Sequence, residues 1–272
     1  MSAGMNDTLR RHILITGATG GIGGALARLL ARPDTRLSFV ARDAARLQRL
    51  VDALAGFAYS ATAISADLGD PDSAALIAAE ARRRHGPIDI LVNNAAVNGF
   101  GHLEDLAPRE IQRVFATNLM APVLLTRAVV PEMIARKRGQ IVNIGSIFGS
   151  IGFAGFSAYS SGKFALRGFS EALRRELDGS GVAVTYVAPR YTKTALNSPA
   201  VNDMALATRM AMDEPADVAR QIVAAIESRR AELVIGRAER VFVRLNALWP
   251  KLVDRGLVRT TRRIREIVKP AA

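Results

Sequence analysis

The chain has 272 residues, of which 49% are apolar and 23% charged; this is ample material for a folded core and excludes a disordered protein. It contains no cysteine, which excludes disulfides, thiolate zinc sites and cysteine nucleophiles, and its three histidines are not spaced as metal ligands. The formal net charge of +12 suggests a nucleic acid, an acidic protein or an anionic membrane as a partner.

Short apolar runs alternate along the chain with longer stretches rich in alanine and leucine. The runs predict strands at residues 12–16, 36–40, 59–65, 88–92, 140–145, 182–188 and 232–235. The longer stretches predict helices at residues 21–31, 44–55, 72–85, 108–135, 157–178 and 214–228. Repeated strand–helix–strand units predict an α/β fold, with a doubly wound parallel sheet of about seven strands and helices on both faces.

Neither a fixed-period repeat nor a linker rich in proline, glycine or serine divides the chain. We therefore predict one domain at residues 1–236 and a C-terminal extension at residues 237–272. Residues 228–272 hold twelve Lys/Arg and four Asp/Glu, so most of the net charge lies in this last segment. Because the body is nearly balanced and shows no groove-reading motif, we expect no nucleic-acid partner.

The first predicted strand runs into a glycine-rich turn that is followed by a helix, Thr16-Gly17-Ala18-Thr19-Gly20-Gly21-Ile22-Gly23-Gly24. Glycine allows a tight turn and lets the backbone approach a pyrophosphate, which the N–H groups at the helix start then face. The strand–turn–helix context favours a dinucleotide site of the Rossmann type over a flexible loop.

The residues after the second predicted strand bear on the choice of dinucleotide. A carboxylate at this strand end commonly binds the ribose 2′-hydroxyl of NAD, but Ala41 stands here and Asp43 lies two residues further on. Arg42 could instead form a charge-assisted fork with a 2′-phosphate. The sequence therefore favours NADP(H) over NAD(H), the alternative being a solvated arginine.

A second group of polar residues has the spacing of an acid–base centre. Tyr159 and Lys163 stand four apart, which places both on one face of a helix, where an ammonium would lower the pKa of the tyrosine. Ser146 ends the fifth predicted strand, Asn118 lies in the long helical stretch before it, and Asn94 follows the fourth strand.

Together these motifs resemble the short-chain dehydrogenase/reductase family across residues 12–236: the glycine turn, Asp67, Asn93-Asn94-Ala95, Asn118, Ser146 and Tyr159-x-x-x-Lys163. The resemblance implies four catalytic residues, Asn118, Ser146, Tyr159 and Lys163. Tyr159 would be the general acid/base, Lys163 would tune it and hold the nicotinamide ribose, and Ser146 would polarise the substrate oxygen. Asn118 would hold a proton-relay water by kinking its helix. The implied cofactor-binding residues are Gly17, Thr19, Gly21, Ile22, Gly23, Arg42, Asp67, Leu68, Asn94, Ala95, Tyr159, Lys163, Pro189, Thr192 and Thr194.

The implied reaction is hydride transfer between NADP(H) and a carbonyl or secondary alcohol. Two positions depart from the family pattern. Ala96 stands where the family has a glycine, which adds only a methyl group, and Arg190 stands where the family has a glycine after Pro189. Arg190 could meet an acidic substrate or the cofactor phosphates, or it could point to solvent. The alternative function on the same fold is a non-enzymatic dinucleotide sensor.

The expected substrate loop, residues 191–213, is rich in alanine, leucine and methionine. It suits an adaptable apolar lid over an apolar or acyl-type substrate, or else ordinary helix packing. In the extension, apolar residues recur at helical spacing between arginines, and Pro250 predicts a break into two short helices.

Three interpretations of the extension stay open: a solvated face over a core stripe, contact with an anionic membrane surface, or contact with an acidic carrier protein. The family resemblance further implies a homodimer or homotetramer, assembled through the helices that hold Asn118 and Tyr159. The polar N-terminus lacks the apolar stretch of a signal peptide, and no uninterrupted run of 18 apolar residues occurs. We therefore expect a cytoplasmic protein, with peripheral membrane association through residues 237–272 as an option.

Overall fold

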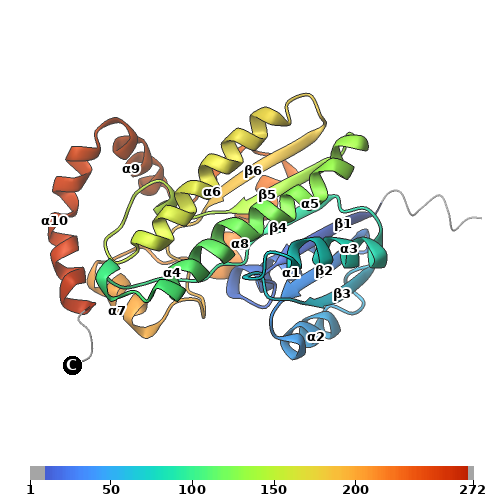
Figure 1. Cartoon of the computed structure of the whole chain (residues 1–272), viewed down its shortest axis with the longest axis horizontal. Helices are drawn as coiled ribbons and strands as arrows, with labels where there is room; N and C mark the ends of the chain where they lie inside the picture. Colours follow the sequence, from blue (N-terminus) through green and yellow to red (C-terminus); the bar gives the residue numbers. More distant parts are fainter. Residues whose placement is uncertain (1–9, 269–272) are drawn as a thin grey trace, which may run out of the picture.

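A computed structural model describes residues 10–268 of the chain. Its centre is one sheet of seven parallel strands in the spatial order β3-β2-β1-β4-β5-β6-β7 (Figure 1). The strands are β1 (Arg11–Thr16), β2 (Thr35–Ala41), β3 (Ser60–Ser65), β4 (Ile90–Asn93), β5 (Gly139–Ile144), β6 (Val182–Ala188) and β7 (Glu232–Val234). The predicted α/β class and doubly wound parallel sheet are confirmed, and the predicted strand ends differ from these by no more than two residues.

Helices connect the strands and extend beyond the last one. The α-helices are α1 (Gly21–Leu30), α2 (Ala44–Ala53), α3 (Ser73–His85), α4 (Pro108–Phe115), α5 (Ala121–Ala135), α6 (Ser157–Glu176), α7 (Pro199–Ala207), α8 (Pro215–Glu227), α9 (Arg237–Leu248) and α10 (Pro250–Ile267). Short 3₁₀ turns occur at η2 (Leu103–Asp105) and η4 (Ile147–Gly149), and a π-helical turn occurs at η3 (Ala116–Met120).

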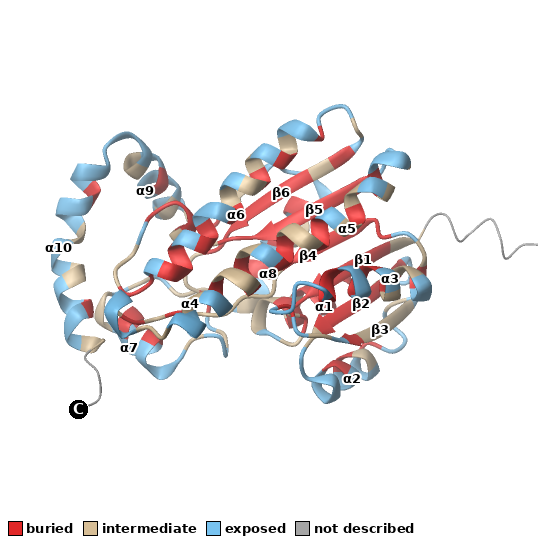
Figure 2. Cartoon of the chain, in the orientation of Figure 1, coloured by how far each residue is buried: buried red, intermediate tan, exposed pale blue. Residues whose placement is uncertain are grey.

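The sheet has a separate apolar core on each face. Successive side chains of a strand point to opposite faces, so Ile13 and Ile15 of β1 lie in one core and Leu14 lies in the other. Helices α1, α2 and α8 close the first core, and α3, α5 and α6 close the second. Figure 2 shows this sandwich as buried strands between helices whose outer faces are exposed. The two cores hold the strands, and therefore the turns that follow them, in fixed positions.

The single helix predicted at residues 108–135 is interrupted. Between α4 and α5 the chain makes a π-helical turn in which the Ala121 N–H donates to the Ala116 carbonyl, five residues back. Asn118 lies in this turn, so the helix is distorted at the residue for which the resemblance implies a kink.

By length and mean hydropathy alone, Pro108–Ala135 passes as a possible membrane span among the described residues. In the fold, however, the inner face of α5 packs against the sheet, and Leu125, Val129 and Met133 are buried there. The apolar character of this segment is therefore explained in large part by the need to cover a parallel sheet.

The predicted substrate loop and the C-terminal extension both contain α-helices. The predicted substrate loop, residues 191–213, contains α7, and the extension forms two helices that break at Pro250, as expected. Val243 and Val253 are buried in a cluster with Tyr186, and Ile264 is buried beside Phe156. The extension therefore packs on the body, and the domain division at residue 236 stays a prediction.

Candidate active site

One cleft of about 1660 Å³ runs along the carboxyl edge of the sheet. All of the site residues predicted from the sequence line it except Asn118, because each belongs to a turn after a strand or to a helix that borders those turns. The cleft is larger than the roughly 300–1,000 Å³ of most small-molecule pockets. It therefore has room for a dinucleotide and a substrate together.

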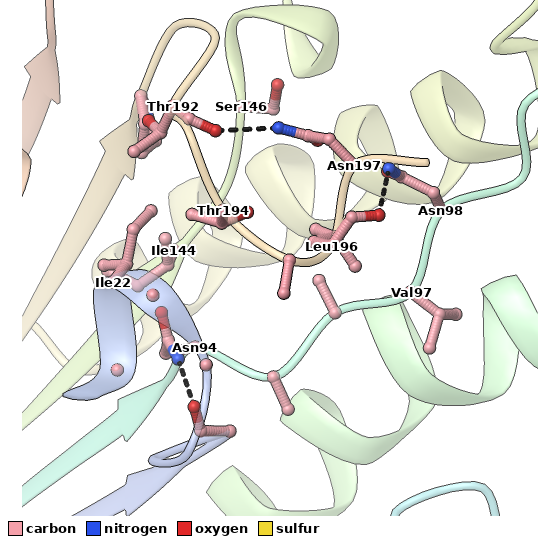
Figure 3. Close-up of a pocket in the computed structure, with 18 of the residues that line it drawn as sticks. Ile22, Asn94, Val97, Asn98, Ile144, Ser146, Thr192, Thr194, Leu196 and Asn197 are labelled. Atoms are coloured by element: carbon pink, nitrogen blue, oxygen red, sulfur yellow. Dashed lines mark hydrogen bonds between the residues drawn. The ribbon is translucent and has the colours of Figure 1, made fainter. Parts of the chain in front are cut away.

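The glycine turn after β1 is bound tightly to the end of β4. The Thr16 hydroxyl accepts hydrogen bonds from the backbone N–H groups of Asn94 and Ala95, each at 3.0 Å. The Asn94 amide donates back to the Thr16 carbonyl at 3.0 Å and to the Gly17 carbonyl at 3.2 Å. Figure 3 shows Asn94 at this point of the cleft. Gly17 has a φ of +63°, and a Cβ there would lie 2.8 Å from the Ala95 Cα. Only glycine fits this close approach.

The start of α1 has the features of a phosphate cradle. A Cβ at Gly23 would lie 2.2 Å from the Gly17 carbonyl oxygen, so glycine lets the first helical turn come close to the loop. Gly20 caps the helix without a side-chain hydrogen bond, and no acidic residue occurs in its first turn. The helix N–H groups and the positive end of the helix dipole therefore face the cleft uncapped, and the residues present fit a dinucleotide pyrophosphate.

Cationic side chains surround the other end of the cleft, after β2. Arg42, Arg46 and Arg49 line it, and within residues 10–268 none of the three makes an ion pair. Asp43 lines the same end of the cleft, and its Oδ1 accepts the Arg46 N–H at 2.9 Å and caps α2. Asp67 lines the cleft after β3, where its Oδ1 accepts the Gly69 N–H at 2.9 Å.

The tyrosine and lysine of α6 are buried at the centre of the cleft. The Lys163 ammonium donates to the Ile144 carbonyl at 2.8 Å and lies 5.8 Å from the centre of the Tyr159 ring. Burial raises the pKa of the Tyr159 phenol to about 12, and hydrogen bonding with Ser146 opposes this rise. Burial also lowers the pKa of the Lys163 amine to about 8. The sequence-based expectation that the ammonium lowers the tyrosine pKa is therefore not met in the protein alone, because desolvation dominates.

Asn118 lies behind the cleft and is completely buried. Its side-chain oxygen accepts the Val97 N–H at 2.8 Å, and its amide donates to the Val97 carbonyl at 2.9 Å. This reciprocal pair fixes the chain that follows Asn94 and Ala95. The amide side chain is thus occupied with the backbone, so any water held at this point would have to bind to main-chain groups of the π-helical turn.

Arg190 takes none of the three roles considered from the sequence. Its guanidinium forms two hydrogen bonds with the Asp213 carboxylate, at 2.7 and 2.9 Å, and contacts Glu239 at 3.3 Å. Hydrogen bonding with Asp213 is the main reason that its pKa rises further above the ordinary value. Arg190 therefore ties the end of the substrate loop and the start of α9 to the end of β6.

The loop after β6 closes over the cleft through contacts that the motifs did not reveal. Asn98 donates to the Leu196 carbonyl at 2.9 Å, and Asn197 donates to the Thr192 carbonyl at 2.8 Å (Figure 3). Thr194 packs on the glycine turn, since a Cβ at Gly21 would lie 2.6 Å from its methyl group. The position of Asn98 just after Asn93-Asn94-Ala95-Ala96 was the only available signal.

An apolar wall borders the cleft beside Tyr159. Phe148 and Phe153 stack with ring centres 4.7 Å apart, and Phe156 lies 5.1 Å from Phe148. Further apolar lining residues come from the substrate loop and from the extension, among them Tyr191, Val201, Met204, Met210, Phe242 and Leu257. The aromatic residues of the 148–156 segment and the contribution of the extension were not predicted as part of the site.

The parallel sheet, the glycine turn and the buried tyrosine–lysine pair define a dinucleotide-dependent class of oxidoreductase. A family model described as short chain dehydrogenase matches residues 11–205. The chain belongs to the short-chain dehydrogenase/reductase family.

Individual relatives agree with this assignment. An uncharacterized oxidoreductase of Bacillus subtilis, YxnA, is 36% identical over 249 residues, covering 89% of this chain and 70% of the relative. The ketoacyl reductase HetN of a Nostoc species is 32% identical, covering 92% of this chain and 89% of the relative.

Solved structures of the same family are similar over most of their length. A short-chain dehydrogenase/reductase from Burkholderia phymatum, in complex with NAD, superposes with a TM-score of 0.81 at 25% identity, covering 89% of this chain and 95% of that one. A metagenomic short-chain oxidoreductase in complex with NADP superposes with a TM-score of 0.69 at 33% identity. The match covers 83% of this chain and 96% of that one. Family members of this fold thus bind either nicotinamide dinucleotide.

The bonds of Arg190 predict that its loss loosens the substrate loop. In Arg190→Ala we expect backbone amides of residues 205–213 to exchange with solvent roughly tenfold faster, since one charged hydrogen-bonded contact contributes about 1–2 kcal/mol. Hydrogen exchange followed by mass spectrometry measures this. Lys193→Ala is the matched control, because the Lys193–Glu214 pair in the same loop is exposed and should contribute little. Equal effects of the two substitutions would contradict the role given to Arg190.

Proposed function

We propose that this protein is an NADP(H)-dependent oxidoreductase that interconverts a carbonyl group and a secondary alcohol on an apolar substrate. The observation that carries the proposal is the placement of Tyr159, Ser146 and Lys163 together in the cleft, between the glycine turn and the aromatic wall. A non-enzymatic sensor is not favoured, since it would need no buried acid–base pair beside an apolar cavity.

A nicotinamide dinucleotide bound in the cleft would supply or accept the hydride. Tyr159 then donates its phenolic proton to the oxygen of the reduced carbonyl, and in the reverse direction it withdraws that proton. Ser146 donates a hydrogen bond to the same oxygen and stabilises its developing charge. Lys163 is oriented by the Ile144 carbonyl and stabilises the phenolate that remains.

The preference for NADP(H) rests on the cations after β2. Arg42, Arg46 and Arg49 line that end of the cleft, whereas the Asp43 carboxylate is bound to the start of α2. A 2′-phosphate would find several hydrogen-bond donors there, and a 2′-hydroxyl would find no free carboxylate at Ala41. Similar structures hold NADP in one case and NAD in another, so the preference rests on the residues after β2 alone.

The preference for an apolar substrate rests on the wall beside Tyr159. Phe148, Phe153 and Phe156 line it, and α7 and α10 add Met204 and Leu257. Burying a hydrocarbon chain against such a surface is favourable in proportion to the area covered. The name of the Nostoc relative, a ketoacyl reductase, is consistent with an acyl-type carbonyl.

Replacing Tyr159 with phenylalanine tests the reaction. Tyr159→Phe should lower kcat by roughly 10²–10⁴, because the proton donor is removed, while NADPH still binds. NADPH oxidation with a panel of ketones and NADPH fluorescence titration measure the two properties. Tyr191→Phe is the matched control, since that hydroxyl lines the cleft but bonds to Asn202. Full turnover by Tyr159→Phe would overturn the mechanism, and NADPH binding without turnover by the unchanged protein would favour the sensor.

Replacing Arg42 tests the cofactor preference. Arg42→Ala should weaken NADPH binding by roughly ten- to a hundredfold, as expected when charge-assisted hydrogen bonds worth about 1.5–3 kcal/mol are lost, and should leave NADH binding nearly unchanged. Dissociation constants for both cofactors provide the measurement. Arg109→Ala, an exposed arginine of α4 outside the cleft, controls for the loss of one positive charge. A parallel loss for both cofactors would remove the basis of the NADP(H) preference.

A series of alkyl ketones of increasing length tests the apolar wall. We expect kcat/KM to rise by up to about fourfold per added methylene until the wall is covered. Leu257→Asp should abolish this gain for long members and spare short ones, since it places a carboxylate on the wall. Leu206→Asp is the control, because Leu206 of α7 is exposed and does not line the cleft. A kcat/KM independent of chain length would contradict an apolar substrate.

A further inference from the structure

The helices of the extension meet at a corner that displays apolar side chains to solvent. The corner consists of residues 247–252, between the end of α9 and the first turn of α10, and every one of these residues is exposed. The exposed fractions are 67% for Leu248, 60% for Trp249 and 52% for Leu252. In Figures 1 and 2 the two helices form an arch at one end of the molecule, with largely exposed outer faces.

This display is not a by-product of poor packing. Each helix has a separate inner face, on which Val243, Val253 and Ile264 are buried against the body, and Phe242 and Leu257 border the cleft. The corner residues therefore form a second apolar surface that points away from the core. A helix that only covers a core stripe would place polar residues there.

The same helices hold an excess of positive charge that no ion pair among residues 10–268 neutralises. Residues 237–268 carry three acidic side chains, of which Glu239 contacts Arg190, and nine basic ones. Within the described residues none of the nine forms an ion pair: Arg237, Arg240, Arg244, Lys251, Arg255, Arg259, Arg262, Arg263 and Arg265. In the body, by contrast, arginines such as Arg82 and Arg136 pair with carboxylates.

The cations lie beside the apolar corner. Lys251 is part of the corner, Arg244 lies one helical turn before Leu248, and Arg255 lies one turn after Lys251, all exposed. Tryptophan and leucine side chains between arginines and lysines suit the boundary between lipid headgroups and acyl chains. There the rings and methyl groups enter the apolar layer while the long basic side chains reach the phosphates.

We propose that residues 247–252 dock on an anionic lipid surface, with Leu248, Trp249 and Leu252 entering the interface and the neighbouring cations binding the headgroups. A projecting corner with an apolar tip and flanking cations fits a flat, deformable and anionic surface. The proposal does not depend on the reaction, since the corner residues lie outside the cleft.

Trp249 makes the test direct, because it is the only tryptophan of the chain. The full-length protein is mixed at low salt with vesicles of phosphatidylcholine alone or of phosphatidylcholine with phosphatidylglycerol. We expect a blue shift of the tryptophan emission and co-sedimentation with the anionic vesicles only, both reversed by added salt.

Substitutions separate the two components of docking. Lys251→Gln and Arg255→Gln should each weaken partitioning onto anionic vesicles roughly fivefold. Leu248→Ser should weaken it as well, while keeping tryptophan as the reporter. Phe57→Ser is the matched control, because Phe57 is 64% exposed in the turn between α2 and β3 and should leave binding unchanged. Melting temperatures and NADPH affinity show whether each variant is folded.

Three results would overturn the proposal. The first is an unchanged Trp249 emission and no co-sedimentation with anionic vesicles, or equal binding to neutral ones. The second is a blue shift induced by polyglutamate but not by vesicles, which would assign the corner to an acidic protein. The third is a blue shift that depends on protein concentration alone, which would assign it to a second copy of the chain.

Discussion

The parallel direction of all seven strands is the constraint on which this structure depends. Parallel strands end at one edge of the sheet, so the turns after β1 to β6 deliver their side chains to a single cleft. The spatial order of the strands then sets the order of functions along that cleft. The cations follow β2, the glycine turn follows β1, and the proposed acid–base residues follow β5 or lie on α6. Thr16 and Asn94 tie β1 to β4 at the point where the strand order reverses.

Burial favours one protonation state of the proposed acid–base residue, Tyr159. Removing Tyr159 from water favours its neutral form, and Lys163 is held by a carbonyl rather than by a carboxylate that would neutralise it. The protein alone therefore keeps the phenol protonated at neutral pH. A protonated phenol is the form that can donate a proton to a reduced carbonyl, as the proposed function requires.

The sequence predicted the elements whose chemistry is local. Strand and helix periodicity, the glycine turn and the Tyr159–Lys163 spacing each depend on residues close together in the chain, and the structure places these residues as expected. Arg190 could not be interpreted in this way, because its partners Asp213 and Glu239 lie 23 and 49 residues away. The Asn98–Leu196 contact could not be predicted for the same reason, since its partners are 98 residues apart. The rise in the pKa of Tyr159 could not be predicted either, because it depends on burial, which residue spacing does not show.

The extension has two surfaces with different consequences. Its inner surface, through Glu239, Phe242 and Leu257, borders the cleft and is tied to the body by Arg190. Its outer surface holds the corner of residues 247–252 and the neighbouring cations, which form no ion pair within residues 10–268. Since different side chains form the two surfaces, a substitution can change docking without touching the cleft. The two surfaces nevertheless share rigid helices, so a chain docked at the corner would hold the apolar wall at a fixed position relative to the lipid. In the proposed docking, this geometry would suit a substrate that partitions into membranes, and the excess charge would act in location rather than in the reaction.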